Sequence, residues 1–520
     1  MSNTPDAVKQ FKRIGVVGAG NMGSMMAFAF SEIGLDVSIW DVKRENVDSF
    51  AKQLQQAKGL KGEIEPIHDV DEFMRSLDGQ GERKLFIFSI THGYPADSVL
   101  SQIKQDLKKG DIILDGGNEH YRNTERRQKE CEEIGVSWIG MGVSGGYQSA
   151  RHGPSMSPGG DPDSLDGVVP LLELYAAKDP KTGMPCVMNM GPRGAGHYVK
   201  MIHNGIEVGM MSAICEAWSF LSSGLGLSYD EIGNIFAKWN DSGEMRTTYL
   251  LNLAADICRT TKSSQGEQKG EGASNVDGYV LDDILDKVVQ DDDSSEGTPT
   301  WSIIESASRH VSAPTLASGL YFRIASGNRA ERLKVAQKIG MPTPNSVTGI
   351  KEREAIIEQL RRAVYCVFLS SFCQGLEIIS RASIEEEWNI DLAKCIQIWR
   401  AGCIIQSEYI ADMFQPLLNK EENHQLTNMK LLDRVAQELQ QNYAAIKHVV
   451  ATGASFDHYL PAISSTLEYM KYVGGAKLPT QFMEAEMDYF GAHSYNKPGV
   501  PGEDPGPTAK GSHHYEWKPA

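Results

Sequence analysis

Short runs of apolar residues alternate with helical segments along the amino-terminal part of the chain. The runs predict strands at 13–17, 37–40, 85–88, 112–114 and 136–139. Strands that alternate with helices in this way form a mostly parallel sheet with helices on both faces. The pattern therefore predicts a doubly wound α/β domain of the Rossmann type.

The pattern changes near residue 194, where helical periodicity replaces the alternation of strands and helices. Long helical segments are expected over 363–380, 384–400 and 426–448. Beyond Tyr489 the chain is rich in glycine and proline, which disfavours regular elements. We therefore expect a Rossmann domain over 1–193, a large all-α domain over 194–474 and an extended C-terminal tail over 475–520.

A glycine-rich turn follows the first predicted strand. The residues that we expect to contact a dinucleotide there are Gly18, Gly20, Asn21, Met22 and Gly23. In the order strand, glycine turn, helix and second strand, the first glycine permits a tight turn, the second lets the backbone approach a pyrophosphate, and the third lets helix and strand pack closely. The amino terminus of the following helix then binds phosphate.

Asp41 ends the second strand and bears on the choice of dinucleotide. A carboxylate at this position accepts hydrogen bonds from ribose hydroxyls and repels a 2′-phosphate, which favours NAD over NADP. Lys43 and Arg44 follow after Val42 and could offset part of that repulsion, or they belong to a solvated turn. Both dinucleotides stay open, with NAD favoured. Asn118, at another strand end, is expected beside the same dinucleotide.

The segment from Gly194 to Glu207 carries four chemically capable side chains. At about 100° per residue in a helix, one stripe holds Lys200, His203, Asn204 and Glu207, and the first and last stand about 10 Å apart along the axis. An amine and a carboxyl group at this spacing could act as an acid/base pair around a small substrate. The alternative is that the stripe is the solvated face of an amphipathic helix.

Two features favour the functional interpretation of this helix. Gly205 and Gly209 each cost about 1 kcal/mol relative to Ala inside a helix, so close packing has displaced local propensity. The neighbours of the stripe are apolar, as expected of a buried helix whose polar side lines a cavity; they are Met201, Ile202, Ile206, Val208, Met210 and Met211. Removal from water favours the neutral forms of both Lys200 and Glu207.

Composition narrows the possible functions. The chain has 51 Lys and Arg against 68 Asp and Glu, a net charge of -17, which leaves no overall attraction to nucleic acid or acidic membranes. Neither an apolar leader nor a membrane-spanning run is evident, and we expect a soluble cytoplasmic protein. The eight cysteines lack metal-ligand spacing, so we expect reduced core residues and no metal.

Four further segments carry a distinctive combination of residues: Gly116-Gly117-Asn118, Ser144-Gly145-Gly146, 399–405 and 488–493. By themselves, the glycine-rich segments indicate only turns. Taken with the glycine turn and the 196–207 helix, they resemble the 6-phosphogluconate dehydrogenase family, within the wider β-hydroxyacid dehydrogenases. The resemblance covers nearly the whole chain, and the last two segments distinguish this family from its shorter relatives.

The resemblance implies an NAD(P)-dependent oxidative decarboxylation of a 3-hydroxy aldonate to a ketopentose, giving ribulose 5-phosphate if the substrate is 6-phosphogluconate. It implies that Lys200 acts as general base and then acid, and that Glu207 protonates the enol. The implied substrate contacts are Asn118, Ser144, Gly145, Gly146, His203, Asn204, Arg323 and His493. The family likeness further implies a homodimer whose tail carries His493 into the partner's site.

The chain departs from the family pattern around the sugar phosphate. Val208 replaces a tyrosine, Met487 replaces an arginine, and Glu296 stands where a phosphate-binding lysine is expected. A phosphate desolvated beside a carboxylate would lose charge-assisted hydrogen bonds and gain repulsion. We therefore expect weakened binding of 6-phosphogluconate, or a substrate without that phosphate, unless Lys262 or Lys269 reaches the site from a displaced loop.

Two other functions stay open on the sequence alone. A non-decarboxylating β-hydroxyacid dehydrogenase is disfavoured by the presence of both His203 and Glu207 and by the long second helical part. A catalytically silent dinucleotide-binding regulator is suggested by the lost phosphate contacts. It is disfavoured by the retention of Lys200, Asn204 and Glu207.

Overall fold

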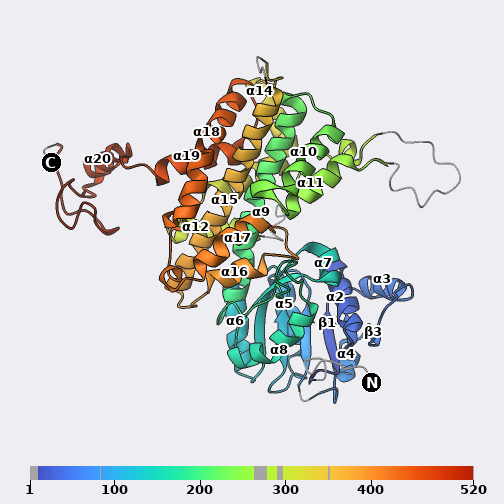
Figure 1. Cartoon of the computed structure of the whole chain (residues 1–520). Helices are drawn as coiled ribbons and strands as arrows, with labels where there is room; N and C mark the ends of the chain where they lie inside the picture. Colours follow the sequence, from blue (N-terminus) through green and yellow to red (C-terminus); the bar gives the residue numbers. More distant parts are fainter. Residues whose placement is uncertain (1–9, 82, 263–277, 290–296, 349–351, 519–520) are drawn as a thin grey trace. The chain divides into compact units, whose positions relative to one another are not determined.

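The computed structural model describes residues 10–81, 83–262, 278–289, 297–348 and 352–518 (Figure 1). By its internal contacts the chain divides into two compact units, Met1–Leu467 and Glu468–Ala520. The first unit holds both the sheet and most of the helices, and its cavity contains the candidate site. The second unit holds the C-terminal tail.

A seven-stranded sheet forms the amino-terminal part of the first unit. Its strands are β1 (Arg13–Val17), β2 (Asp36–Trp40), β3 (Ile64–Ile67), β4 (Leu85–Phe88), β5 (Ile112–Asp115), β6 (Ser137–Ser144) and β7 (Ser155–Gly159). They lie in the order β3-β2-β1-β4-β5-β6-β7, all parallel except β7, which is antiparallel to β6. Because the chain runs outward in both directions from β1, ligands are expected at the carboxyl ends of the strands beside it.

Helices cover both faces of this sheet (Figure 1). They are α2 (Asn21–Glu32), α3 (Arg44–Leu54), α4 (Val70–Ser76), α5 (Tyr94–Ile103), α6 (Tyr121–Glu132), α7 (Gly146–His152) and α8 (Pro162–Tyr175). Successive residues of a strand point to opposite faces, and accordingly Val16 and Val17 of β1 belong to different apolar cores. The predicted doubly wound Rossmann domain is therefore confirmed.

Two strands of the sheet are absent from the sequence-based prediction. β3 is short, and β7 lies in a segment whose prolines and glycines resemble a turn. The serines of β7 are buried because the helical part of the unit satisfies them: Ser155 Oγ donates to the Ile398 carbonyl oxygen at 2.6 Å, and Ser157 Oγ donates to that of Gly196 at 2.9 Å. Such long-range partners leave no local signal in the sequence.

The second part of the first unit is helical. Its α-helices are α9 (Ala195–Ser219), α10 (Tyr229–Asp241), α11 (Tyr249–Arg259), α12 (Thr298–Ser308), α13 (Pro314–Gly327), α14 (Arg329–Ile339), α15 (Arg353–Glu385), α16 (Leu392–Ile398), α17 (Glu408–Leu418), α18 (Asp433–Ser455) and α19 (Pro461–Val473), the last of which extends into the second unit. This confirms the predicted large all-α part, and α9 begins beside the boundary proposed at 193/194.

The helix predicted over 384–400 is wrong. Its first residues end α15, and α16 begins only at Leu392. Between them, Glu387 and Asn389 both have φ of 54°, a left-handed conformation that ends a right-handed helix. α15 is also long and apolar enough to cross a membrane by length and composition, a feature absent from the sequence analysis, but its apolar window is wholly buried within the protein.

The tail is more ordered than its glycine and proline content indicates. Residues Thr480–Gly491 form α20, so the segment expected to be extended contains a helix. The Asp488 carboxylate accepts hydrogen bonds from the backbone N–H groups of Ser494 and Tyr515, from His514 and from the Trp517 indole, at 2.8–3.1 Å. The segment after α20 therefore folds back onto it.

Candidate active site

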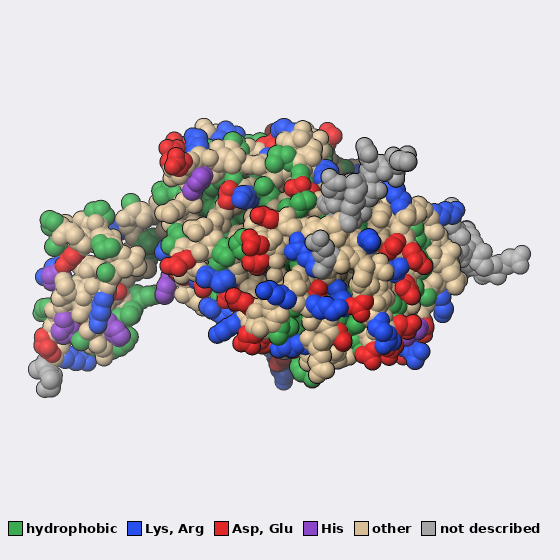
Figure 2. Space-filling view, turned by 90° about the horizontal axis from the view of Figure 1, so that it is seen from below, with side chains coloured by type: hydrophobic (Ala, Val, Ile, Leu, Met, Phe, Trp, Pro, Cys, Tyr) green, Lys and Arg blue, Asp and Glu red, His purple; other side chains and the backbone are tan. Residues whose placement is uncertain are grey.

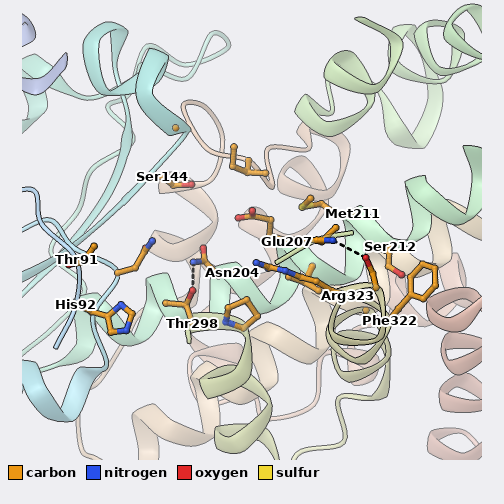
Figure 3. A pocket seen from close by; sticks show the side chains of 18 of the residues that line it. Thr91, His92, Ser144, Asn204, Glu207, Met211, Ser212, Thr298, Phe322 and Arg323 are labelled. Atoms are coloured by element: carbon orange, nitrogen blue, oxygen red, sulfur yellow. Dashed lines mark hydrogen bonds between the residues drawn. The ribbon is translucent and has the colours of Figure 1, made fainter. Parts of the chain in front are cut away.

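A cavity of about 2070 Å³ extends from the carboxyl edge of the sheet along α9 (Figure 3). It is lined by most of the residues expected from the sequence, namely Gly18, Gly20, Asn21, Met22, Asp41, Lys43, Asn118, Ser144, Gly145, Gly146, Lys200, Asn204, Glu207 and Arg323. Pockets that bind a drug-sized ligand measure about 300–1,000 Å³. The cavity therefore has room for a dinucleotide together with a small substrate.

In the glycine turn after β1, the packing of the turn requires Gly18 and Gly23 but not Gly20. Gly18 has φ of 102°, and a Cβ on Gly23 would stand 1.9 Å from the Gly18 carbonyl oxygen, so the turn itself needs both glycines. Gly20 has nothing within 4 Å of an added Cβ and is the N-cap of α2 without a side-chain cap. Open space and helix N–H groups together fit a bound pyrophosphate.

Asp41 fastens this turn to the end of β2. Its carboxylate accepts hydrogen bonds from the backbone N–H groups of Ala19 and Lys43, both at 2.8 Å, and from the Asn46 amide at 2.9 Å. Three internal bonds hold the carboxylate in place, and it still lines the cavity. Asn46, which the sequence did not single out, lines the cavity too.

Lys200 and Glu207 both face the cavity from α9. Burial lowers the pKa of Lys200, against the influence of Glu207, and the side chain is only 8% exposed. Burial raises the pKa of Glu207, although Lys200 and Arg323 act in the opposite direction. Each shift favours the neutral form, as removal from water does for any acid or base. The site therefore holds an amine suited to accept a proton and a carboxyl group suited to donate one.

His203 lies behind the cavity wall and binds two side chains that line the cavity, Ser144 and Asn204. Burial lowers the pKa of His203 well below its usual value, so the ring is neutral. Its Nδ1 lies 3.0 Å from the Asn204 amide oxygen, an acceptor, so Nδ1 donates and Nε2 accepts from the Ser144 hydroxyl, also at 3.0 Å. The Asn204 amide in turn donates to Thr298 Oγ1 at 2.8 Å (Figure 3).

Thr298, in the first turn of α12, is a cavity residue that sequence reasoning missed. Its relation to Asn204 spans 94 positions of the chain, and no local pattern marks it. The close approach of α12 to α9 depends on Gly205, where a Cβ would stand 2.8 Å from Ser302 Cβ. The glycines of α9 thus serve helix packing at the cost of local propensity.

The residues that depart from the family pattern lie in different places. Val208 lines the cavity, whereas Met487 and His493 belong to the second unit, where the His493 ring packs against Phe490. Glu296 and Lys269 lie outside the described residues. Lys262 forms an ion pair with Asp283 at 2.7 Å and is not among the cavity-lining residues, which disfavours a role for it in phosphate binding.

One expectation for the cysteines is wrong. All eight are free thiols and seven are buried, but Cys215 is exposed and lines the cavity. It lies on α9 two turns beyond Glu207, on the face that borders the cavity rather than the face that packs in the core. Within the described part of the chain, no three His, Cys, Asp or Glu side chains gather as they would around a metal ion.

A Rossmann sheet whose glycine turn opens onto a buried amine and carboxyl group defines a dinucleotide-binding protein with an acid/base pair at its ligand site. Comparison with known families identifies the particular one. Residues 13–191 match the NAD binding domain of 6-phosphogluconate dehydrogenase, and residues 196–517 match the 6-phosphogluconate dehydrogenase C-terminal domain. The chain belongs to the 6-phosphogluconate dehydrogenase family.

Relatives align along almost the full length. The decarboxylating 6-phosphogluconate dehydrogenase of Emericella nidulans is 63% identical over 96% of this chain and 100% of its own. The decarboxylating 6-phosphogluconate dehydrogenase 1 of Spinacia oleracea is 34% identical over 97% of each chain. Among solved structures, the Plasmodium falciparum enzyme, described with NADP+ and with 6-phosphogluconate, superposes with a TM-score of 0.82 at 28% identity, over 97% of this chain and 100% of its own.

Proposed function

We propose that the protein catalyses the NAD(P)-dependent oxidative decarboxylation of 6-phosphogluconate, or of a closely related 3-hydroxy sugar acid, to a ketopentose. The observation that carries this proposal is the placement of Lys200 and Glu207 in one cavity with the glycine turn. Both pKa values are displaced towards the neutral forms that the reaction requires at its start. The relatives of this chain carry the name of the same activity.

Lys200 accepts the proton of the substrate hydroxyl group in the proposed reaction. When bound, the dinucleotide supplies a hydride acceptor at its nicotinamide ring. The neutral Lys200 amine accepts the hydroxyl proton while the carbon loses its hydride, and the resulting ammonium then donates a hydrogen bond to the new ketone. A cation beside the ketone oxygen stabilises the negative charge that develops there as carbon dioxide departs.

Glu207 completes the reaction. Loss of carbon dioxide from the β-keto carboxylate leaves an enolate, which takes the proton of the Lys200 ammonium to become an enol. To form the ketopentose, the enol gains a proton on carbon and returns its hydroxyl proton to the Lys200 amine. The protonated Glu207 carboxyl group, standing about 10 Å from Lys200 along the helix axis, is placed to deliver that proton. Asn204 and Ser144, held by His203, are suited to orient the hydroxyl groups of the substrate between the two.

The preference for NAD over NADP is a further part of the proposal. The Asp41 carboxylate lines the cavity where the adenosine ribose is expected, and the next residue, Val42, is 63% exposed and carries no charge. A 2′-phosphate would meet an anion held in place by three hydrogen bonds. Lys43 lines the same region and offsets part of this repulsion, so the preference is one of degree.

We also propose that the protein works as a homodimer whose tail reaches the partner's cavity. Support comes from the exposed apolar side chains of α20: Phe482 is 70% exposed, Met483 59% and Phe490 73%. Figure 2 shows apolar side chains at the surface of the second unit. Such side chains mark contact surfaces. Sedimentation of the full chain, compared with a chain that ends after α19, measures whether the tail holds two copies together.

A substrate panel tests the proposed function. Purified protein is supplied with 6-phosphogluconate or gluconate, each with NAD and with NADP, and both reduced dinucleotide and carbon dioxide are measured. We expect one carbon dioxide per reduced dinucleotide, a higher kcat/KM with NAD, and a KM for 6-phosphogluconate raised by the lost phosphate contacts. Reduction without carbon dioxide would establish a non-decarboxylating dehydrogenase, and no reduction with any pair would exclude the proposal.

A further inference from the structure

A buried ion pair lies beneath the cavity, between the loops that follow β4 and β5. Arg127 is 0% exposed and Glu119 is 2% exposed, and Arg127 Nη1 stands 2.6 Å from Glu119 Oε2. Neither side chain is among the cavity-lining residues. Removing two charges from water is costly, and an apolar pair of similar volume often gives equal or better stability. Stability alone is therefore a weak explanation for this pair.

The pair instead binds both backbone polar groups of one residue in the neighbouring loop, Gly93. Glu119 Oε2 accepts the hydrogen bond of the Gly93 N–H group at 2.8 Å, and Arg127 Nη2 donates to the Gly93 carbonyl oxygen, also at 2.8 Å. Gly93 has φ of 74°, in the left-handed region. A glycine in this conformation is free to move unless its surroundings fix it, and here both of its polar groups are fixed.

The remaining hydrogen-bonding groups of the pair bind both sides. On the side of β5, Glu119 Oε1 accepts from the His120 backbone N–H at 2.7 Å and from the Asn123 amide at 2.9 Å. On the side of β4, Arg127 Nε donates to Asp97 of α5 at 2.7 Å. Burial acts to raise the pKa of Glu119, but Asn123 and Arg127 outweigh it and hold that pKa below its usual value. The carboxylate is thus charged and satisfied.

Both loops that the pair joins carry cavity residues. The loop after β4 contributes Ser89, Ile90, Thr91 and His92, and the first turn of α5 contributes Tyr94 and Pro95. The loop after β5 contributes Gly116, Gly117 and Asn118. Since β4 lies between β1 and β5, both loops border the glycine turn at the carboxyl edge of the sheet. Figure 3 shows Thr91 and His92 on the same side of the cavity as Thr298.

A second contact extends this arrangement to the helical part of the unit. The Trp301 ring of α12 lies 5.1 Å from His92 in one loop and 5.1 Å from His120 in the other, both edge to face. Trp301 stands one turn beyond Thr298, which accepts the Asn204 hydrogen bond. A shift of either loop would therefore disturb the side chain that orients the substrate in the proposed reaction.

We propose that Glu119 and Arg127 are positioning residues, which hold the loop after β4 against Asn118 so that both loops face the dinucleotide and the substrate. The expected change in turnover rests on the proposed function, which identifies the substrate. The expected change in dinucleotide affinity does not depend on that identification. The pair acts through Gly93 and Asn118 and touches neither ligand.

Glu119→Gln tests the inference with a side chain of equal shape. One amide oxygen cannot replace two carboxylate oxygens that accept from Gly93, Arg127, His120 and Asn123, so the loop should loosen. Because small misplacements at a reacting centre cost up to about 10²-fold, we expect kcat to fall about tenfold and the dinucleotide Kd to rise about tenfold. Thermal unfolding should show the protein still folded at the assay temperature.

Arg126→Ala is the matched control. Arg126 is the neighbouring arginine, bonds the same Asp97 and is 45% exposed, but it does not touch Gly93. It should leave both constants unchanged. A Glu119→Gln variant with a lower Tm but unchanged Kd and unchanged kcat per folded molecule would mean that the pair is only structural, and the inference would be overturned.

A milder variant covers the case in which Glu119→Gln does not fold. Asp97→Asn removes a charged partner of Arg127 and leaves the buried pair itself intact, so the same constants should change in the same direction by about twofold. Unchanged constants in this variant would contradict the inference. Dinucleotide titration needs no sugar, so it gives its result even if the wild-type protein fails to oxidise 6-phosphogluconate, which would exclude only the proposed function.

Discussion

The glycine turn and the α9 helix form the two ends of one cavity, and they differ in how their polar groups are satisfied. At the turn, the chain satisfies its own polar groups: the Asp41 carboxylate has three internal hydrogen bonds, and Gly18 and Gly23 are fixed by contacts within the fold. On α9, Lys200 and Glu207 are held where burial displaces both pKa values. In the proposed reaction, the first end binds the dinucleotide and the second end moves protons.

Lys200→Ala should produce the largest effect, and it should separate the two ends. Loss of a general base lowers turnover by about 10²–10⁴-fold, and here the same amine also serves as the acid. Dinucleotide affinity, measured by fluorescence titration, should not change. Lys200→Arg is the control, because a guanidinium keeps the charge but stays protonated, so an active arginine variant would show that no base is needed at this position.

Glu207→Gln should lower kcat by about 10²-fold and change the pH profile. Glu207 must be protonated to act, so activity is lost as pH rises through its pKa, and a raised pKa moves that loss to higher pH. Lys200 must be neutral, so activity rises with pH through its pKa, and a lowered pKa moves that rise to lower pH. The variant should lack the limb that Glu207 produces.

Glu216→Gln is the control for that experiment. Glu216 is another buried carboxyl group of α9 that lines the same cavity, and it accepts hydrogen bonds from the first turn of α19. Burial raises the pKa of Glu216 to about 7, so its titration is a competing explanation for a limb near neutral pH. If this variant, rather than Glu207→Gln, lost the limb, the assignment to Glu207 would fail.

Gly20→Ala and Gly23→Ala should separate ligand binding from folding at the turn. An alanine at Gly20 meets nothing in the protein, so the Tm should hold while the dinucleotide Kd rises about tenfold, or ~1.4 kcal/mol. An alanine at Gly23 meets the Gly18 carbonyl oxygen, so unfolding should become easier by about 1–3 kcal/mol. Equal losses of stability in the two variants would contradict this division.

Asp41→Asn should have the smallest effect of the set. It removes the charge that faces a 2′-phosphate, so kcat/KM with NADP relative to NAD should rise about fivefold, or ~1 kcal/mol. The pH profile should keep both limbs, since the substitution leaves Lys200 and Glu207 in place. An unchanged NADP-to-NAD ratio would mean that Asp41 only fastens the turn.

The two ends also differ in how far the sequence predicts them. The glycine turn is a local motif, so Gly18, Gly20, Gly23 and Asp41 are readable along one stretch, and their places follow from the order of strands and helix. The stripe on α9 is readable too, because helical geometry sets which side chains share a face. Distant segments of the chain bury this stripe, so no local sequence pattern predicts that it is buried.

Part of what the sequence missed depends on such distant segments. Thr298 reaches the cavity through its bond to Asn204, 94 positions away. Asn46 is only five positions from Asp41, but its bond to that carboxylate follows no pattern that marks it in the sequence. β7 is a strand because β6 and the helical part satisfy its serines. The break between α15 and α16 rests on the backbone of Glu387 and Asn389, which apolar periodicity does not reveal.

The central claim, that Glu207 delivers the proton which completes the reaction, is tested most directly by running the reaction in D₂O. The configuration of deuterium at the carbon that loses carbon dioxide is then determined in the ketopentose. The wild-type product should carry one deuterium in a single configuration, and the Glu207→Gln product should contain both. A single configuration from the variant would show that another group delivers the proton and would contradict the account.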